Sequence, residues 1–440
     1  MFHRLFIANR GEVAVRIARA ARSLGIAPVG GVSEADLGAR WTQVLDEVVC
    51  LGPAAARESY LDPARVVQAA LQTRASAVHP GWGFLAESAR FAALCRQHGL
   101  AFVGPSARLM DVMGVKSPAK AAMRAAGLAV LPGSDGPLAD ADAAAASANE
   151  TGYPVILKAD YGGGGRGMRL CRDEAAVREA FGAAAQEAAA AFGSGSIYLE
   201  RYLTGGRHIE VQVLCDRLGA GVHLGERECS IQRKHQKLIE ESPSPALTAD
   251  ERAKLGADAV AAAVALGYEG AGTIEFLRDD DGSLYFMEMN TRLQVEHPVS
   301  ELVTGVDIAA RQIEIAANRS LAALGLAQET IAFEGHAIEC RINAEDPHQD
   351  FRPSPGRLDA FELPSGVDGD VTHRVDTHLA AGDEVTPHYD SLIAKMIVHA
   401  PTRLEAIDAM IGALESARIE GVKTTIPLHL AVLRSDSDDN

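Results

Sequence analysis

The dipeptide Asp281-Gly282 lies in the middle of the stretch 272–296, which we interpret as two strands around a tight turn. Both of its positions tolerate positive φ, so the pair predicts a two-residue β-hairpin loop. In such a hairpin, residues pair when their numbers add up to 563, as 281 and 282 do, and Glu275 lies opposite Glu288. Directly opposed carboxylates repel each other. The hairpin therefore predicts a divalent cation between them.

The second predicted strand has one polar and one mostly apolar face, because strand side chains alternate. The polar face carries Glu288, Asn290, Arg292, Gln294 and Glu296, and the other face carries Met289, Thr291, Leu293 and Val295. Glu275, Glu288 and Asn290 offer the hard oxygen ligands that Mg²⁺ prefers. Arg292 can hold a planar anion, and Glu296 can act as a base. The alternative is an edge strand whose polar face meets water, but Asn and Glu are poor strand formers.

The N-terminal part predicts an α/β unit. A strand, a turn and a helix in the first 25 residues precede a second apolar run at Ile26–Val32. Further strands are expected at 75–78 and 100–103, so the unit continues to about Pro105. The middle of the chain alternates strands with alanine-rich helices. The part after Phe333 is rich in turns and short strands and ends in helices.

Length, charge and cysteine content limit the class of protein. A chain of 440 residues suggests two or three packed units, and its net charge of −17 argues against nucleic acid or an anionic membrane as the main partner. No apolar run is long enough to span a bilayer, and the N-terminus lacks the apolar region of a signal peptide. The six cysteines are scattered, which is typical of reduced thiols. We expect a cytoplasmic protein that binds neither nucleic acid nor membranes.

A glycine-rich segment at 162–167 follows the predicted strand that ends at Lys158. Its glycines match G-x-G-x-x-G, but the segment leads into the strand-like stretch 168–171 instead of opening a helix, which weakens a dinucleotide-binding interpretation. We interpret it as a mobile hairpin whose amides cover a polyphosphate, with Lys158 adding a positive charge. A plain flexible loop is the alternative.

Four stretches in this order make the chain resemble the biotin carboxylase branch of the ATP-grasp ligases. They are 79–85 (HPGWGFL), 226–237 (ERECSIQRKHQK), 288–298 (EMNTRLQVEHP) and 339–346 (ECRINAED). The resemblance implies an α/β fold, α+β overall, in three parts. These are a Rossmann-like pre-ATP-grasp domain at 1–112, an ATP-grasp domain at 113–332 with a mobile lid at about 131–203, and a β-rich C-terminal subdomain at 333–440.

The resemblance also implies roles for individual residues. The implied ATP-binding residues are Lys116, Lys158, Gly164, Gly165, Glu200, Arg201, Tyr202, Leu203, His208, Gln232, His235, Glu275 and Glu288. The implied metal ligands are Glu275, Glu288 and Asn290, and the implied bicarbonate-binding residues are Lys237, Arg292, Gln294 and Val295. Glu296 is the implied general base and Arg341 the biotin-contacting arginine. The catalytic set is therefore Glu296, Arg292, Lys237 and Arg341.

The implied activity is the ATP- and bicarbonate-dependent carboxylation of biotin through carboxyphosphate. This is the first half-reaction of biotin-dependent enzymes such as acetyl-, propionyl- or methylcrotonyl-CoA carboxylase. The implied cofactors are ATP, Mg²⁺ or Mn²⁺ and bicarbonate, with biotin as a carrier-borne substrate. The sequence contains no Ala-Met-Lys-Met carrier motif. A biotin carboxyl carrier and a carboxyltransferase are therefore expected on other chains or on a downstream region, and a homodimer is possible.

The chain departs from the family pattern in two places. Asp160 and Tyr161 stand where small residues usually lead into the glycines, and Leu37–Trp41 replaces a helix that usually contains histidine. Two other functions remain open at this level. One is an ATP-grasp carboxylase that acts on a urea or guanidine nitrogen, and the other is a catalytically silent module that only binds ATP. The complete metal, base and bicarbonate set argues against the second.

Overall fold

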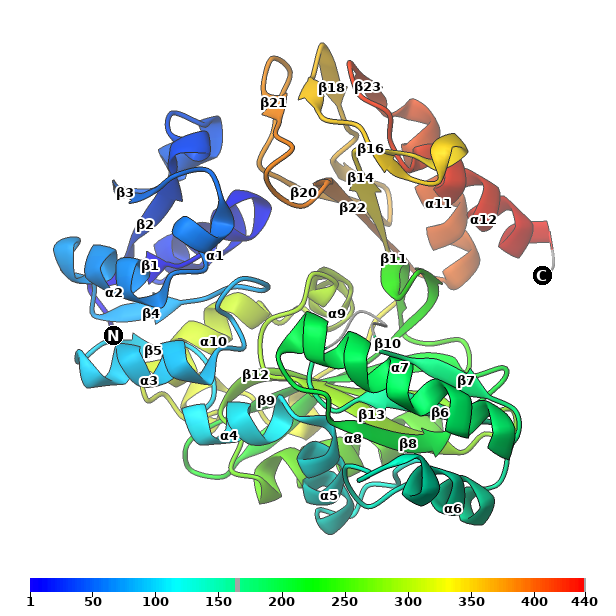
Figure 1. Ribbon diagram of the computed structural model, residues 1–440. Coiled ribbons are helices and arrows are strands. Elements are labelled where there is room, and N and C mark those ends of the chain that lie inside the picture. The colour runs from blue at the N-terminus through cyan, green and yellow to red at the C-terminus, as the bar shows by residue number, and fades with distance from the viewer. Residues whose placement is uncertain (163–166, 439–440) are drawn as a thin grey trace.

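The computed structural model describes residues 1–162 and 167–438, and its N-terminal part is a parallel sheet (Figure 1). The strand order is β3-β2-β1-β4-β5. The strands are β1 Arg4–Ile7, β2 Ala27–Ser33, β3 Glu47–Gly52, β4 Ala77–His79 and β5 Ala101–Phe102, and the helices are α1 Gly11–Ser23, α2 Pro63–Gln72 and α3 Ala89–Gln97. Val13 and Ile17 of α1 are buried, as the helical pattern requires. The predicted α/β unit is therefore confirmed.

A three-stranded antiparallel sheet, ordered β7-β6-β8, forms a second body that carries two helices (Figure 1). Its elements are α6 Ala141–Thr151, β6 Val155–Ala159, β7 Arg169–Cys171, α7 Glu174–Phe192 and β8 Ile197–Arg201. Val155, Leu157 and Leu199 of the sheet pack against Val177 and Ala184 of α7. This sheet lies within the stretch 131–203, where a lid is expected.

A nine-stranded antiparallel sheet forms the centre of the molecule. Its order is β13-β12-β9-β10-β11-β14-β22-β20-β19. The strands are β9 Arg207–Cys215, β10 Gly221–Arg233, β11 Gln236–Ser242, β12 Gly270–Arg278, β13 Leu284–Asn290, β14 His336–Asn343, β19 Gly366–Asp368, β20 Val371–Thr377 and β22 Leu392–Ala400. Because β11 pairs with β14, the sheet continues across the expected domain boundary at 332/333.

The remaining elements cover this sheet and extend the C-terminal part. The helices are α4 Ala107–Met113, α5 Lys116–Ala125, α8 Ala249–Ala265, α9 His297–Thr304, α10 Ile308–Ala316, α11 Arg403–Ser416 and α12 Ile426–Asp438. Three short strand pairs are β15 Glu345–Asp346 with β16 Arg352–Pro353, β17 Gly356–Arg357 with β21 Glu384–Val385, and β18 Ala360–Glu362 with β23 Arg418–Glu420. Within the described ranges, no helix combines the length and the apolar character needed to cross a membrane.

The hairpin of β12 and β13 pairs Glu275 with Glu288, as predicted, but its loop is longer than two residues. Arg278 pairs with Leu284, which leaves the five residues 279–283 in the loop. A β-bulge after Glu275 inserts one residue and changes the register by one position. The predicted two-residue turn is therefore wrong, and the bulge restores the expected pairing at the two carboxylates.

The polar row that follows β13 is not one continuous strand. β13 ends at Asn290, and the next residues form an irregular segment up to Glu296, which is the N-cap of α9. Pro298 lies in the first turn of that helix, where its missing N–H costs no hydrogen bond. The prediction of a single strand as far as residue 296 is therefore wrong, because the chain leaves the sheet after Asn290 and the polar residues up to Glu296 lie in an irregular segment.

Candidate active site

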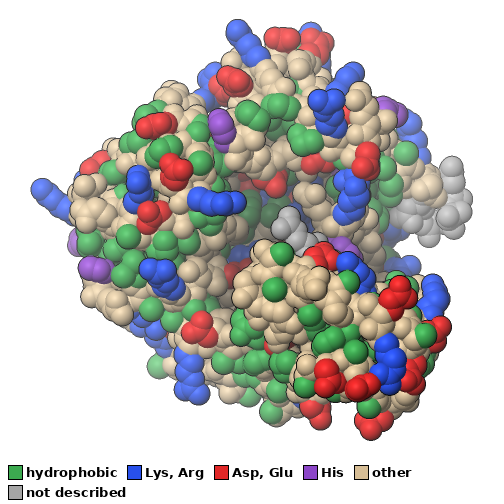
Figure 2. All heavy atoms as spheres, in the orientation of Figure 1, with side chains coloured by type: hydrophobic (Ala, Val, Ile, Leu, Met, Phe, Trp, Pro, Cys, Tyr) green, Lys and Arg blue, Asp and Glu red, His purple; other side chains and the backbone are tan. Residues whose placement is uncertain are grey.

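One cleft, with a volume of about 680 Å³, brings the predicted site residues together. It is lined by Lys116, Lys158, Glu200, Arg201, Tyr202, Leu203, His208, Gln232, His235, Lys237, Glu275, Glu288, Asn290, Arg292, Gln294, Val295, Glu296 and Arg341. Figure 2 shows a hollow on this face of the molecule, where the three parts of the chain meet. Gly164 and Gly165, also predicted to bind ATP, lie outside the described residues.

Lys237, on β11, lies among three carboxylates in the depth of this cleft. Its Nζ atom is 2.5 Å from Glu296 Oε1 and 3.0 Å from Glu275 Oε1, and it also donates to Glu210. Burial alone would lower the pKa of Lys237, but these carboxylates raise it well above its usual value. The ammonium group therefore stays charged and provides a fixed cation for a small anion.

Glu296 joins Lys237 to Arg341, which projects from β14. Arg341 Nη2 is 2.9 Å from Glu296 Oε2, and Arg341 Nε is 2.6 Å from Glu240 Oε1 on β11. Burial would raise the pKa of Glu296, but Lys237 and Arg341 hold it far below its usual range. Burial raises the pKa of Glu240 to about 7, with Arg341 opposing the shift. Glu296 is thus ionised at neutral pH and can accept a proton.

Arg227 binds a residue that contacts Lys237, and it was not assigned a role from the sequence. Its side chain is fully buried on β10 and donates to five acceptors. Those acceptors are Glu210 Oε1 at 2.5 Å, Gln212 Oε1 at 2.9 Å, Gln294 Oε1 at 3.0 Å, Ser300 Oγ at 3.0 Å and Thr273 Oγ1 at 3.1 Å. Because it binds both Glu210 and Gln294, Arg227 fixes a counter-ion of Lys237 and a predicted bicarbonate ligand.

Arg292 is oriented by a residue from the N-terminal part of the chain. Its Nε atom is 2.9 Å from Glu87 Oε2, and its Nη2 atom is 3.0 Å from Asn290 Oδ1. The other oxygen of Glu87 accepts the backbone N–H of Thr291 at 3.1 Å. Glu87 thus holds both the side chain and the local backbone of this segment. No sequence pattern near Glu87 indicated this contact.

The two carboxylates predicted to bind a metal face each other across β12 and β13. Glu275 is buried and accepts hydrogen bonds from Asn290 Nδ2 at 2.7 Å and Gln294 Nε2 at 3.0 Å. Glu288 is more open and lies 2.6 Å from Lys116 Nζ. Two facing carboxylates and an amide oxygen form the donor set that suits Mg²⁺, so these residues fit the ion.

Two other groups of possible ligand atoms converge among the described residues, and neither includes Glu288. They are His208, Glu210 and Glu275, and Glu210, Cys229 and Glu296. Lys237 Nζ already contacts Glu210, Glu275 and Glu296, so an ammonium supplies the positive charge at this point. Burial also raises the pKa of the Cys229 thiol well above its usual value, which disfavours the thiolate that a metal needs. We therefore favour the facing carboxylates as the metal position.

Lys116 on α5 and Lys158 on β6, from two different bodies, line the opposite end of the cleft. Lys158 on β6 and Lys120 on α5 both pair with Glu200 on β8, the second at 3.1 Å. Burial would raise the pKa of Glu200, but the two lysines lower it to about 2. Lys116 is the first residue of α5, and its pKa is raised because Glu288 outweighs burial, which alone would lower it. No sequence pattern indicated a role for Lys120, whose partner is 80 residues away.

Of the predicted nucleotide residues on β9 and β10, His208 contacts Glu275 directly and Gln232 contacts it through His208. Gln232 Nε2 lies 2.6 Å from His208 Nδ1, and His208 Nε2 lies 2.8 Å from Glu275 Oε2. Burial would lower the pKa of His208, but Glu275 raises it. His235 lies in the β10–β11 turn, with a φ of 65°. His208 and Gln232 thus form a chain that orients Glu275.

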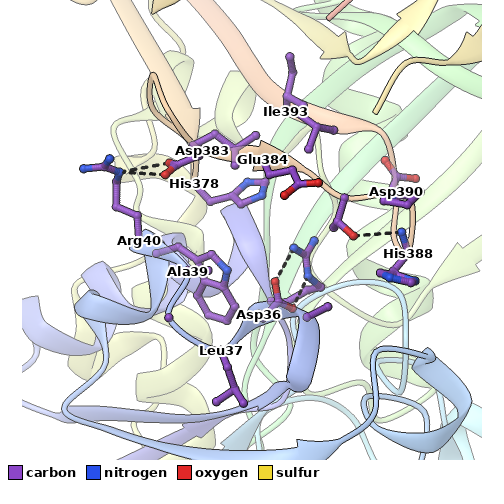
Figure 3. Close-up of a pocket in the computed structure, with 18 of the residues that line it drawn as sticks. Asp36, Leu37, Ala39, Arg40, His378, Asp383, Glu384, His388, Asp390 and Ile393 are labelled. Carbon is purple, nitrogen blue, oxygen red and sulfur yellow. Dashed lines mark hydrogen bonds and ion pairs between the residues drawn. The ribbon is translucent and has the colours of Figure 1, made fainter. Parts of the chain in front are cut away.

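Two further cavities lie between the N-terminal and C-terminal parts. One, of about 640 Å³, is lined by residues 35–41 and parts of 378–393, and none of the predicted site residues lines it (Figure 3). Arg40 reaches Asp383 across it, with Nε 3.1 Å from Oδ2. The other, of about 350 Å³, is lined by Trp82 and Phe84 and shares Val295 and Arg341 with the main cleft. The second cavity therefore opens a separate approach to Arg341.

Three family descriptions match successive parts of the chain. Residues 1–110 match "Biotin carboxylase, N-terminal domain", residues 116–324 match "Carbamoyl-phosphate synthase L chain, ATP binding domain", and residues 339–439 match "Biotin carboxylase C-terminal domain". Among curated proteins, biotin carboxylase 1 of Bacillus subtilis is 50% identical over 99% of this chain and 96% of its own length. Biotin carboxylase of Pseudomonas aeruginosa is 49% identical over 99% and 95%.

Solved structures with the same fold come from similar enzymes. The biotin carboxylase domain dimer of Hydrogenobacter thermophilus 2-oxoglutarate carboxylase, in complex with MgADP, ADP and bicarbonate, is 48% identical. Its TM-score is 0.93, and the match covers 99% of this chain and 94% of that one. Biotin carboxylase of Campylobacter jejuni, in a β-γ-ATP complex, is 46% identical with a TM-score of 0.95, covering 100% and 97%.

Proposed function

The chain belongs to the biotin carboxylase family, and on that premise we propose that it carboxylates biotin in an ATP- and bicarbonate-dependent reaction. The observation that carries the proposal is the contact chain Lys237–Glu296–Arg341 in the same cleft as the lysines of α5 and β6. One end of the cleft suits a polyphosphate, and the other suits a small planar anion. The ligands of the Hydrogenobacter thermophilus domain, MgADP and bicarbonate, have these two chemistries.

In the first step, bicarbonate attacks the γ-phosphorus of ATP and gives carboxyphosphate and ADP. We assign Lys237, Arg292, Gln294 and the backbone near Val295 to bicarbonate, and Glu296 to its proton. Bicarbonate is a poor nucleophile, so an ionised carboxylate beside it promotes attack by accepting that proton. Lys237 and Arg292 hold the anion in line with the phosphate and reduce the entropy cost of the reaction.

We assign the nucleotide to the residues at the other end of the cleft. Lys116 and Lys158 hold the phosphates, and Glu200 to Leu203, with His208, Gln232 and His235, line the rest of the nucleotide site. Glu275, Glu288 and Asn290 would hold Mg²⁺ or Mn²⁺, which when bound supplies positive charge that stabilises phosphoryl transfer. The contact of Lys116 with Glu288, its one ion-pair partner within residues 1–162 and 167–438, supports this assignment, because a phosphate can replace that carboxylate.

In the second step, carboxyphosphate breaks down to CO₂ and phosphate, the phosphate accepts the proton of the biotin ureido N–H, and the ureido nitrogen captures the CO₂. We assign Arg341 to the negative charge that develops on the ureido oxygen of biotin. Support comes from the cavity of about 350 Å³, which is lined by Arg341 and Val295 and by none of the residues assigned to the nucleotide. Biotin can therefore approach without displacing ATP.

Biotin has to be brought by another protein or domain, since the sequence contains no carrier motif. We propose a biotin carboxyl carrier and a carboxyltransferase as partners. Relatives are named as parts of larger enzymes, such as the 2-oxoglutarate carboxylase small subunit of Hydrogenobacter thermophilus. We also propose a homodimer, as described for the biotin carboxylase domain from that organism. A cytoplasmic location is inferred from six cysteines that form no disulfide within the described residues.

We propose the domain division 1–112, 113–332 and 333–440, with a lid at about 131–203. The five parallel strands all end before residue 112, and the three-stranded sheet lies within the lid range. The boundary at 332/333 is the weaker of the two in physical terms, because β11 and β14 pair across it.

The reaction is tested by ADP release with ATP, Mg²⁺ and bicarbonate, in the presence of biotin, urea or no acceptor. We expect biotin to increase ADP release and urea to leave it at the level without acceptor. Stimulation by urea would point to carboxylation of urea, and no bicarbonate-dependent release under any condition would contradict catalysis.

Arg341→Ala tests the assignment of the acceptor. We expect at least a roughly hundredfold loss of biotin carboxylation, because an oxyanion-stabilising donor contributes about that much, and an unchanged affinity for ATP. Arg233→Ala is the control, since Arg233 pairs with Asp350 and does not line the cleft. Equal losses of nucleotide binding and carboxylation would count against the assignment.

A further inference from the structure

Asp160 is an unusual residue at the end of β6, where the family pattern has a small side chain. In the structure it is 3% exposed and bound to the start of α5. Its Oδ1 atom accepts the backbone N–H of Ser117 at 2.8 Å and the Ser117 hydroxyl at 2.7 Å. Its backbone carbonyl accepts the N–H of Lys116 at 3.0 Å. One residue therefore receives three hydrogen bonds from the first two residues of this helix.

These bonds complete the N-terminus of α5, which has no cap of its own. The N-cap residue is Val115, whose side chain cannot accept a hydrogen bond. Pro118 has no N–H, and Ala119 makes the first bond within the helix, to Val115 O at 3.0 Å. The N–H groups of Lys116 and Ser117 both go to Asp160. A helix start without such acceptors leaves polar groups unpaired.

The same contacts fix the two lysines that face the phosphates. Lys116 is the first residue of α5, and Lys158 lies two residues before Asp160 on β6. Asp160 is itself held from the other side, because its N–H donates to Ser196 O at 2.9 Å. We propose that Asp160 is a positioning residue that fixes Lys116 relative to Lys158 and so sets the spacing of the phosphate-binding cations. Its carboxylate acts through the helix and not on the substrate.

The inference rests on the proposed role of Lys116 in ATP binding. Asp160→Ala removes the acceptor of Ser117 and lets the first turn of α5 move. We expect the KM for ATP to rise about five- to tenfold, in line with the loss of a helix cap, and the KM for bicarbonate to change less than about twofold. Asp160→Asn keeps an oxygen in the same place, so it is expected to restore the KM for ATP to within about twofold of wild type.

Asp140→Ala is the matched control. Asp140 caps α6 in the same way, accepting the N–H of Ala143 at 2.8 Å, but it does not line the cleft. We expect the control to leave the KM for ATP within about twofold of wild type, because it also removes a cap but one remote from the lysines. A similar rise in the KM for ATP in both variants would overturn the inference, since any loss of a cap would then be sufficient.

A double-mutant cycle with Lys116→Ala separates the inference from the function on which it rests. If Asp160 acts through Lys116, Asp160→Ala changes the KM for ATP by less than about twofold in the Lys116→Ala background. If the two substitutions instead raised the KM for ATP independently, so that their effects multiplied in the double variant, the inference would be overturned and the role of Lys116 would remain. An unchanged KM for ATP in Lys116→Ala alone would overturn both. Hydrogen exchange gives a readout without substrate, because the Ser117 amide should exchange faster in Asp160→Ala than in wild type.

Discussion

The two ends of the cleft hold their cations in different ways. The inner end of the cleft is the end that carries Lys237, Glu296 and Arg341, and the outer end is the end that carries Lys116 and Lys158. At the inner end, Lys237 contacts three carboxylates, and Arg341 contacts two. At the outer end, Lys116 pairs with Glu288, whose side chain is 37% exposed. An ammonium with one open partner can exchange it for a phosphate, whereas a cation bound by several buried carboxylates keeps its position. Lys116 at the outer end is thus placed for exchange, whereas Lys158 at the same end keeps the buried partner Glu200 and the cations of the inner end keep a fixed geometry.

The strongest test of the inner end is Glu296→Gln. We expect bicarbonate-dependent ATP cleavage to fall roughly 10²- to 10⁴-fold, because the amide cannot accept the proton of bicarbonate. Nucleotide affinity, measured by equilibrium binding, should stay within about twofold, since Glu296 belongs to the other end of the cleft. Glu241→Gln is the control, because Glu241 is a buried carboxylate on β11 that pairs with His336 and Arg403 instead. Wild-type turnover in Glu296→Gln would refute the base assignment.

A second test asks whether the inner end also supports the fold. Arg227→Met removes one of the two cations that bind the buried Glu210 and leaves several buried polar groups without a donor that they now have. We expect a loss of about 3–5 kcal/mol in the free energy of unfolding, the usual result of breaking a buried ion pair. Urea unfolding measures it. Arg217→Met removes an exposed arginine paired with Glu269 and should cost less than about 1 kcal/mol. If the two variants lost a similar amount of unfolding free energy, the buried position of Arg227 would not distinguish it from an exposed arginine.

A third test concerns acid stability at the outer end. The pKa of Glu200 falls from 4.5 to about 2 on folding. The ionised carboxylate therefore contributes fully to the free energy of unfolding above pH 4.5, and this contribution is lost as the pH falls towards 2. Its size is roughly 3 kcal/mol, from 1.36 kcal/mol for each pH unit. The difference in unfolding free energy between wild type and Glu200→Gln should therefore narrow over that range. A difference independent of pH would exclude Glu200 as its source.

The smallest expected effect is at Glu87. Its side chain is 43% exposed, so its ion pair with Arg292 is screened by water. Glu87→Gln should raise the KM for bicarbonate about two- to fivefold, in proportion to an exposed ion pair, and leave the KM for ATP unchanged. Steady-state kinetics with each substrate varied in turn measures both. A rise in the KM for ATP alone would place Glu87 with the outer end.

The sequence predicted the fold class and the facing pair Glu275 and Glu288, but not the path between them. Alternation and turn chemistry are local, so they led to the right pair through a turn that is three residues too short. The β-bulge that restores the register has no marker in the sequence. The end of β13 at Asn290 was missed for a similar reason, because the polar–apolar alternation continues through the irregular residues 291–296 and does not show that the strand has ended.

The supporting residues of the inner end could not be predicted by the same reasoning. Arg227 and Glu210 are 17 positions apart, and Glu240 is 101 positions from Arg341. Each is a charged residue inside a strand, and such a residue alone is more often expected at the surface. Only the pairing of β9, β10, β11 and β14 brings these charges together. The resemblance to a family predicted the groups that meet substrate, and the structure showed which residues hold those groups in place.

The pairing of β11 with β14 limits how this protein can be divided. A fragment that stops near residue 332 would keep Lys237 but expose the hydrogen-bonding edge of β11, and exposed edges recruit other strands. The complementary fragment would carry Arg341 on an equally open β14. Mixing the two halves could rebuild the sheet along this seam, as in a split-protein pair. Neither half would form the site by itself, because Lys237 and Arg341 lie on different halves. The backbone hydrogen bonds between β11 and β14 therefore hold the sheet together and bring these two residues into one site.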